Sequence, residues 1–344
     1  MKAVVIYEHG GVDKLKYTEI PNPDVQANDV LVEVKACAMN HLDIWVRKGI
    51  LNLNLEYPHV LGSDVAGVVA KVGRSVSGVE AGVPVLVYPG ITCRRCTYCL
   101  SGRDNLCREY QILGEHRSGG CAEYVSVPME SIIPMPKNIS FEEGACIPLV
   151  FLTAWHMLVS RARIENGETV LVHAAGSGVG SAAIQIAKLF GATVITTAGT
   201  DEKVEKAKRL LGADYAINYR GQDFFAEVQK ITERGGVDIV IDHTGAINWE
   251  RSILSLTMGG RMVVCGATSG HEGKMDIRRL FANRLSILGS TMGTKNDLLE
   301  VLKHVESGKL KPVLYKVFPM AQVAKGHILM ENRDVFGKIV LISS

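Results

Sequence analysis

From residue 168 onward, short apolar runs alternate with segments of helical periodicity, and this alternation constrains the possible folds most strongly. Buried parallel strands read as apolar runs, and they need crossover connections that are usually helices. The pattern therefore predicts an α/β fold with a doubly wound parallel sheet of six strands. We expect these strands at residues 169–174, 192–197, 215–218, 237–242, 261–265 and 285–288.

The first 150 residues have a different pattern, in which Gly and Pro separate short strand-like runs. The runs at 30–34, 65–72, 84–88 and 122–127 predict an antiparallel, barrel-like β domain. A chain of 344 residues exceeds what one small core needs, so two domains are expected. The tail after about residue 295 ends in a strand at 337–342, which either finishes the parallel sheet or returns to the β domain.

The formal net charge is only +2, and the sequence has no basic run or cluster of Arg and aromatic residues that would form a nucleic-acid surface. The expected partner is therefore a small molecule. The longest apolar stretch, at 147–159, contains His156 and is shorter than the roughly 20 residues that cross a bilayer, so no membrane span is expected. The N-terminus begins as a strand without an apolar leader, which predicts a cytoplasmic protein.

Residues 170–180 combine an apolar strand, a turn of small residues and the start of a helix. Small residues let the backbone approach a pyrophosphate, and the free amides of a helix N-terminus favour its negative charge. The turn could instead serve only to pack the helix tightly on the strand. Its place at the head of the βα repeats favours a dinucleotide site, with the binding residues Ala175, Gly176, Ser177, Gly178 and Val179.

The end of the second predicted strand indicates which dinucleotide binds. NAD enzymes usually place Asp or Glu about 20 residues beyond the turn, where it binds the ribose hydroxyls. Here the segment from Thr197 to Gly199 contains no acid, and Lys203 follows at the start of the next helix. A lysine without a neighbouring carboxylate attracts a 2′-phosphate, so the sequence favours NADP(H) over NAD(H). Alternatively, Lys203 is one of several solvated lysines on its helix.

Half of the eight cysteines lie in one short loop, as Cys93, Cys96, Cys99 and Cys107. Four thiolates at this spacing can enclose one tetrahedral zinc and leave no position for water or substrate, so one structural zinc is predicted. Disulfides are disfavoured in a reducing cytosol, and an iron–sulfur cluster is an alternative that no nearby redox motif supports. The remaining cysteines are expected to be inert core thiols: Cys37, Cys121, Cys146 and Cys265.

Three stretches together resemble the medium-chain dehydrogenase/reductase superfamily: the cysteine loop, the turn at 175–180, and residues 58–69 with the sequence Pro-His-Val-Leu-Gly-Ser-Asp-Val-Ala-Gly-Val-Val. The resemblance covers essentially the whole chain. It implies a GroES-like β-barrel catalytic domain at 1–150 and 292–344, with a zinc lobe near 90–110, and a Rossmann cofactor-binding domain at 151–291. It also implies an active site between the domains, and a homodimer or homotetramer.

Zinc alcohol dehydrogenases of this superfamily bind a catalytic metal through a Cys, a His, and a further Cys or Asp. The matching positions here carry Asn40, Ser63 and Leu149, which cannot form that ligand set. The sequence therefore resembles the quinone oxidoreductase and zeta-crystallin branch more closely, although that branch usually lacks the cysteine lobe.

Without a catalytic metal, hydride transfer favours an acceptor that delocalises charge, such as a quinone or an α,β-unsaturated carbonyl. The resemblance places Asn40 at the former metal position beside the nicotinamide, where its amide would donate a hydrogen bond to the developing negative charge. His41 or Tyr57 would relay a proton.

Two alternatives concern neighbouring side chains. Asp43 and Asp64 could re-form a weak metal site with His41. His116 could reach the site, or could simply make a hydrogen bond within its loop.

The resemblance also indicates residues around the cofactor, mostly at the C-terminal ends of strands, where open α/β sheets bind ligands. Tyr219 and Arg333 would join Lys203 around the 2′-phosphate. The residues for the nicotinamide half are Thr153, Thr244, Gly245, Gly266, Ala267, Ser290, Thr291 and Met292.

The leading hypothesis is thus an NADPH-dependent oxidoreductase that transfers hydride to a quinone or activated carbonyl and carries one structural zinc. An NAD(P)-dependent alcohol dehydrogenase or aldehyde reductase is the enzymatic alternative. A non-catalytic NADPH-binding protein is the alternative from another class.

Overall fold

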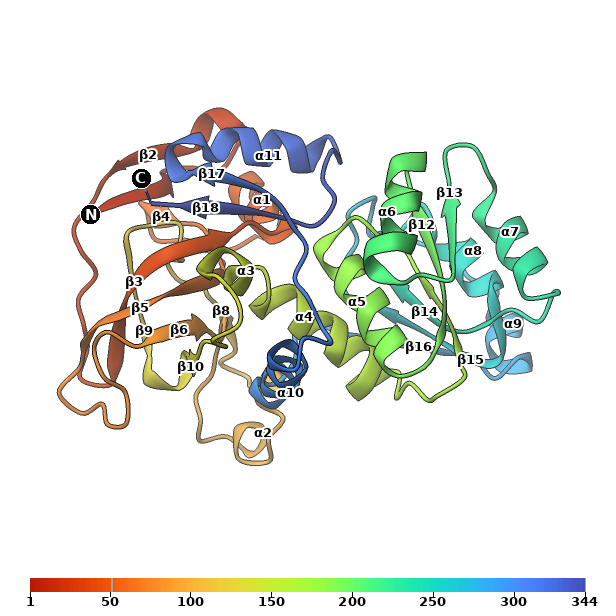
Figure 1. Ribbon diagram of the computed structural model, residues 1–344, viewed down its shortest axis with the longest axis horizontal. Helices are drawn as coiled ribbons and strands as arrows, with labels where there is room; N and C mark the ends of the chain where they lie inside the picture. The colour runs from red at the N-terminus through yellow and green to blue at the C-terminus, as the bar shows by residue number, and fades with distance from the viewer. Residues whose placement is uncertain (51, 344) are drawn as a thin grey trace. The chain divides into compact units, whose positions relative to one another are not determined.

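The computed structural model describes residues 1–50 and 52–343 (Figure 1). The chain divides into two compact units. Unit 1 consists of Met1–Leu149 and Thr294–Ser344, and unit 2 consists of Val150–Gly293. Within the described residues, no helix combines the length and the apolar character that crossing a bilayer requires.

Unit 2 is built on a six-stranded parallel sheet, which confirms the predicted fold class. From edge to edge its strands are β13 (Tyr215–Asn218), β12 (Thr193–Ala198), β11 (Thr169–Val172), β14 (Val237–Asp242), β15 (Leu256–Val264) and β16 (Ser286–Gly289). The strand order reverses between β11 and β14, so their C-terminal ends form the switch point where such sheets bind ligands. β15 begins at Leu256, earlier than predicted, because Leu256 already pairs with Val237 before the register against β14 shifts.

Helices cover both faces of this sheet. Figure 1 shows α5 (Gly178–Leu189) and α6 (Asp201–Leu211) on one side, and α7 (Phe224–Ile231), α8 (Trp249–Leu254) and α9 (Ile277–Ala282) on the other. α4 (Pro148–Trp155) and a π-helical segment, His156–Arg161, precede the first strand of the sheet. The apolar strands that were visible in the sequence form the core with the inner faces of the helices, as Leu171, Ile195 and Val240 illustrate.

Unit 1 contains a seven-stranded sheet that joins the beginning and the end of the chain. Its order is β10 (Ile132–Pro134), β6 (Pro84–Val87), β5 (Asp64–Val72), β3 (Asp29–Ala38), β18 (Lys338–Ile342) and β17 (Leu314–Pro319), and β9 (Tyr124–Pro128) also pairs with β3. β18 pairs antiparallel with β3, so the tail extends this sheet and not the parallel sheet of unit 2. A smaller sheet contains β2 (Lys16–Glu19), β1 (Lys2–Ile6) and β4 (His59–Val60).

Unit 1 includes the helices α1 (His41–Lys48), α3 (Phe141–Ala145), α10 (Lys295–Glu306) and α11 (Val323–Glu331). The cysteine segment forms a lobe with β7 (Gly90–Ile91), α2 (Thr97–Leu100) and β8 (Gln111–Ile112). Single 3₁₀ turns occur at Val12–Lys14, Asp104–Leu106, Met129–Ser131 and Met320–Gln322.

Candidate active site and metal loop

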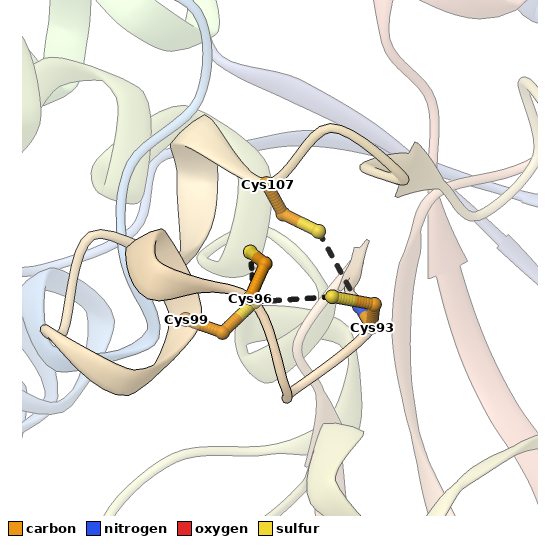
Figure 2. Close-up of side chains that lie close together, drawn as sticks. All are labelled: Cys93, Cys96, Cys99 and Cys107. Carbon is orange, nitrogen blue, oxygen red and sulfur yellow. Dashed lines mark hydrogen bonds between the residues drawn. The ribbon is translucent and has the colours of Figure 1, made fainter.

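The four loop cysteines converge on one point, although they come from different parts of the lobe (Figure 2). Cys93 follows β7, Cys96 precedes α2, Cys99 lies within α2, and Cys107 follows a 3₁₀ turn. All four sulfur atoms lie within 4.8 Å of one another, and the cysteines form no disulfide. The lobe therefore brings together the residues that the spacing predicted to share a ligand.

The separations of these sulfur atoms fit a single tetrahedral ion. The distance from Cys93 Sγ to Cys99 Sγ is 3.9 Å, and that from Cys96 Sγ to Cys99 Sγ is 3.5 Å. Zinc–sulfur bonds of about 2.3 Å imply a tetrahedron with edges of about 3.8 Å. A cluster of several iron atoms would hold its sulfur ligands further apart than one ion does, so the geometry favours the zinc alternative over the iron–sulfur one.

The pKa values of thiols differ within the loop. Amide N–H donors of Arg95 and Cys96 lower the pKa of Cys93 to about 6. Burial raises the pKa of Cys99 to about 12. A bound dication would stabilise all four thiolates together, which the protein alone does not.

In unit 2, the small-residue turn has the geometry of a helix N-terminus that accepts a phosphate. Ser177 caps α5, because its Oγ accepts a hydrogen bond of 2.9 Å from the amide of Gly180. A Cβ at Gly180 would lie 2.3 Å from the carbonyl oxygen of Ala174, so only glycine allows this turn. The remaining amides of the first helical turn are the groups that would face a pyrophosphate.

The predicted cofactor residues of unit 2 gather mainly at the C-terminal edge of the parallel sheet, in the loops after the strands. Asp242 shapes the loop after β14, where its Oδ1 accepts hydrogen bonds from the amides of Thr244 and Gly245 at 2.6 and 3.1 Å. Thr153 instead lies buried in α4. The residues after β15 and β16 are Gly266, Ala267, Ser290, Thr291 and Met292.

The side chain of Thr197 is engaged within the fold. Its Oγ1 accepts a hydrogen bond of 3.1 Å from the amide of Ala174 and lies 3.3 Å from His173 Nδ1. Its hydroxyl therefore ties β12 to the small-residue turn.

Beyond β12, two side chains from the loop after β13 approach Gly199. A Cβ at Gly199 would lie 2.7 Å from the Tyr219 hydroxyl and 3.6 Å from Arg220 Nε, so both side chains approach this backbone. Lys203 lies in the first turn of α6, where its amide donates to the capping Thr200. Arg220 was not predicted from the sequence, because the sequence pattern does not show that the loop after β13 lies next to the end of β12. Arg333 belongs to unit 1 and lies between α11 and β18.

In unit 1, Asn40 belongs to a buried polar cluster with Asp64 and Lys338, which are 5%, 0% and 4% exposed respectively. Lys338 Nζ donates to Asn40 Oδ1 at 2.5 Å and to Asp64 Oδ2 at 2.9 Å. Asn40 Nδ2 donates to the same Asp64 oxygen at 2.9 Å. The amide of Leu149 donates to Asp64 Oδ1 at 2.7 Å.

Asp43 lies next to this cluster and forms a capping box with Asn40 at the N-terminus of α1. Its two oxygens accept hydrogen bonds from the amides of Asn40 and Gly62, at 2.7 and 3.0 Å. Burial raises its pKa to about 6, although these amides and Lys338 oppose the shift. Ser63 is fully buried, and its hydroxyl has no hydrogen-bond partner among the described residues.

The other predicted catalytic side chains lie outside this cluster. His41 stacks edge-on against Trp45, and burial lowers its pKa. Tyr57 is 43% exposed and contacts the ring of His9. His116 Nδ1 accepts a hydrogen bond of 3.2 Å from the amide of Ile112, which matches the loop role left open above.

The structure does not support the rebuilt metal site. Among residues 1–50 and 52–343, the cysteine loop is the one group of three or more His, Cys, Asp or Glu side chains that converge on a point. Asp43 and Asp64 are instead occupied by amide donors and, for Asp64, by Lys338.

Comparison with known proteins decides the family. A family model for the alcohol dehydrogenase GroES-like domain matches residues 26–137, and one for zinc-binding dehydrogenases matches residues 178–307. Human quinone oxidoreductase is 30% identical to this chain over 99% of its length and 98% of the human protein. The chain belongs to the medium-chain dehydrogenase/reductase superfamily. The protein is therefore an NAD(P)H-dependent oxidoreductase.

Proteins with different names resemble the chain over essentially its whole length. Acryloyl-coenzyme A reductase from Sulfurisphaera tokodaii is 30% identical over 99% of both proteins. A crystal structure named NAD-dependent alcohol dehydrogenase superimposes with a TM-score of 0.96 and 51% identity, over 100% of both chains. Similarity alone thus leaves the substrate to be argued from the site.

Proposed function

We propose that this protein reduces an α,β-unsaturated carbonyl compound or a quinone by hydride transfer from NADPH, without a catalytic zinc. Bound NADPH would supply the hydride, which an enone would accept at its β-carbon while its carbonyl oxygen takes the negative charge of an enolate. A proton from solvent would then bond to the α-carbon. Such an acceptor spreads the developing charge by itself, which lessens the need for a Lewis acid.

The observation that carries this proposal is the Asn40–Asp64–Lys338 cluster. By resemblance, Asn40, Ser63 and Leu149 occupy the metal-ligand positions of zinc alcohol dehydrogenases. Neither the amide of Asn40 nor the hydroxyl of Ser63 replaces a thiolate or imidazole as a zinc ligand. The nearby carboxylate of Asp64 is already paired with the ammonium group of Lys338 at 2.9 Å. We further propose that the cysteine loop holds one structural zinc per chain.

The names of the relatives support two candidate functions. Quinone oxidoreductase and acryloyl-coenzyme A reductase are names of enzymes with delocalised acceptors. The solved structure at 51% identity carries the name of an NAD-dependent alcohol dehydrogenase, and this similarity favours a second candidate, the oxidation of an alcohol with NAD⁺. Initial rates with a quinone, an enone, an aldehyde and an alcohol, each with both cofactors, separate the two.

For the cofactor we propose NADPH, bound at its 2′-phosphate by Lys203, Arg220 and Tyr219 after β12 and β13. Replacement of Lys203 or Arg220 by Ala should raise the Kd of NADPH about tenfold, because each removes a charge that faces the phosphate, and should leave the Kd of NADH nearly unchanged. Fluorescence titration of each cofactor measures both constants.

Lys206→Ala is the matched control. Lys206 lies one turn further along α6 and pairs with Glu202 at 2.5 Å. Equal binding of NADH and NADPH to the unmodified protein, or equal losses in the control and test variants, would contradict the assignment of the 2′-phosphate site.

A further inference from the structure

The cysteine lobe contacts the start of α10, a helix from the other end of the chain (Figure 1). Asp104 begins the 3₁₀ turn Asp104–Leu106, which leads directly to Cys107. Its Oδ2 accepts a hydrogen bond of 3.2 Å from the backbone amide of Lys295, the first residue of α10. The second segment of unit 1 begins at Thr294. This contact therefore joins the two segments of unit 1 at the point where the second one begins.

The amide of Lys295 needs an acceptor from outside its helix, because the first amides of an α-helix have no carbonyl partner within it. Two neighbouring amides are satisfied within the helix start. Thr294 Oγ1 accepts from the amide of Asp297 at 3.1 Å, and an Asp297 carboxylate oxygen accepts from the amide of Thr294 at 2.9 Å. Asp104 completes this cap from the lobe, and its negative charge suits the positive end of the helix dipole.

Asp104 is also connected to the metal loop through its own backbone. The amide of Cys107 donates a hydrogen bond of 3.0 Å to the Asp104 carbonyl oxygen, which closes the turn before the fourth thiol. The Tyr88 hydroxyl donates to Asp104 Oδ2 at 3.1 Å and so helps to orient the carboxylate. Because one tight turn joins Asp104 to Cys107, the position of this carboxylate depends on the position of that ligand.

A second contact between the lobe and α10 is weaker. Arg94, next to Cys93, forms an ion pair with Glu130, and the ammonium group of Lys295 donates to the Glu130 carbonyl oxygen. The side chains of Arg94 and Glu130 are 49% and 39% exposed, and exposed ion pairs contribute little to stability. The connection between lobe and helix therefore depends mainly on Asp104.

We propose that the cysteine lobe is the N-terminal cap of α10, so that metal binding by the four thiolates and folding of the first turn of α10 are linked, resting on the structural zinc proposed above and not on the choice of substrate. The regular elements of the lobe are too short to hold its shape alone. A metal that fixes Cys107 also fixes the Asp104 carboxylate at the helix, and loss of the metal releases both. Since linkage is reciprocal, loss of the cap weakens metal binding.

Hydrogen–deuterium exchange of zinc-loaded protein, and of the same protein stripped with EDTA, measures this link in one direction. Amides in residues 294–298 should exchange about tenfold faster after stripping, which is the expected effect of losing one hydrogen bond to a charged group. α11, elsewhere in unit 1, is the internal reference and should keep its exchange rates.

Variants of the zinc-loaded protein measure the other direction. Asp104→Ala removes the acceptor, so exchange in residues 294–298 should be about tenfold faster and zinc affinity lower by a similar factor, as measured by competition with a fluorescent chelator. Asp104→Asn keeps an oxygen that can accept from the Lys295 amide and should recover part of both effects. Glu109→Ala is the matched control and should leave both quantities unchanged, because Glu109 is another acid of the lobe and pairs with Arg95 at 3.4 Å.

These measurements separate the possible failures. Purified protein without zinc would contradict the metal assignment and the linkage with it. Zinc-loaded protein whose residues 294–298 exchange equally fast before and after stripping would overturn the linkage alone. Wild-type exchange and wild-type zinc affinity in Asp104→Ala, or equal losses in Glu109→Ala and Asp104→Ala, would overturn it as well.

Discussion

At the scale of single residues, the most informative side chains are charged groups that are buried beside one another. Asp43 is 2% exposed, and the groups that act on its ionisation include Lys338 on β18 and Asp64 on β5. Burial dominates and raises its pKa from the usual 3.8 to about 6. The folded protein therefore binds this proton more tightly than the unfolded chain does.

The raised pKa of Asp43 predicts a pH dependence of stability. The stabilising contribution of the protonated carboxyl is complete below about pH 4 and falls as the pH rises through 6, by about 3 kcal/mol in total. In Asp43→Asn, which cannot ionise, this component should be absent. Urea unfolding of both proteins between about pH 4 and pH 7 measures the difference between them.

The exposed residue Asp24 supplies the control, because Asp24→Asn should follow the wild-type pH dependence. A constant difference in unfolding free energy between Asp43→Asn and the wild-type protein across this range would contradict the raised pKa.

Residue-level prediction from sequence succeeded where spacing carries the information. The four loop cysteines are close in the chain, and they meet in the fold. Lys338 is 298 positions from Asn40, and nothing in the closing strand signals that its first residue is buried. Only the pairing of β18 with β3 brings these two side chains together.

At the scale of elements, the cysteine lobe contains little regular structure. Its regular elements are short: α2 has 4 residues and β7 has 2. Elements this short are unstable alone, so a metal bound to four thiolates would supply much of the lobe's stability.

Substitution of one ligand tests this dependence. Cys107→Ser should lower the zinc content at least about tenfold, because a serine hydroxyl is a poor replacement for a thiolate, and should expose residues 93–107 to proteolysis. Elemental analysis and limited proteolysis measure the two effects. Cys265→Ser, in unit 2, should retain the zinc. A Cys107→Ser protein with full zinc content and an intact lobe would show that these thiolates are not the ligand set.

The small-residue turn shows how far an element can be predicted from sequence. The strand, turn and helix follow from the apolar run and the glycines, and the structure places β11 and α5 as expected. The engagement of the Thr197 hydroxyl by Ala174 could not be predicted, because it depends on how β12 lies beside the turn.

At the scale of the whole molecule, two sequence patterns predict the fold. Apolar runs that alternate with helical segments predicted the parallel sheet of unit 2, and short interrupted strand-like runs predicted the β-rich unit 1. The pattern of the tail predicted a strand but was compatible with either sheet, because a strand pattern does not identify the neighbouring strand. In the structure the tail carries Lys338 into unit 1, and so the last strand becomes part of the candidate site.

We propose that this protein reduces its acceptor without a catalytic zinc and holds one structural zinc. Zinc per chain, counted by native mass spectrometry, and turnover of NADPH with an enone and a quinone, measured on the same sample, test it most directly. We predict one zinc per chain together with reduction of at least one of these acceptors. Two zinc ions per chain together with oxidation of a simple alcohol would contradict the claim.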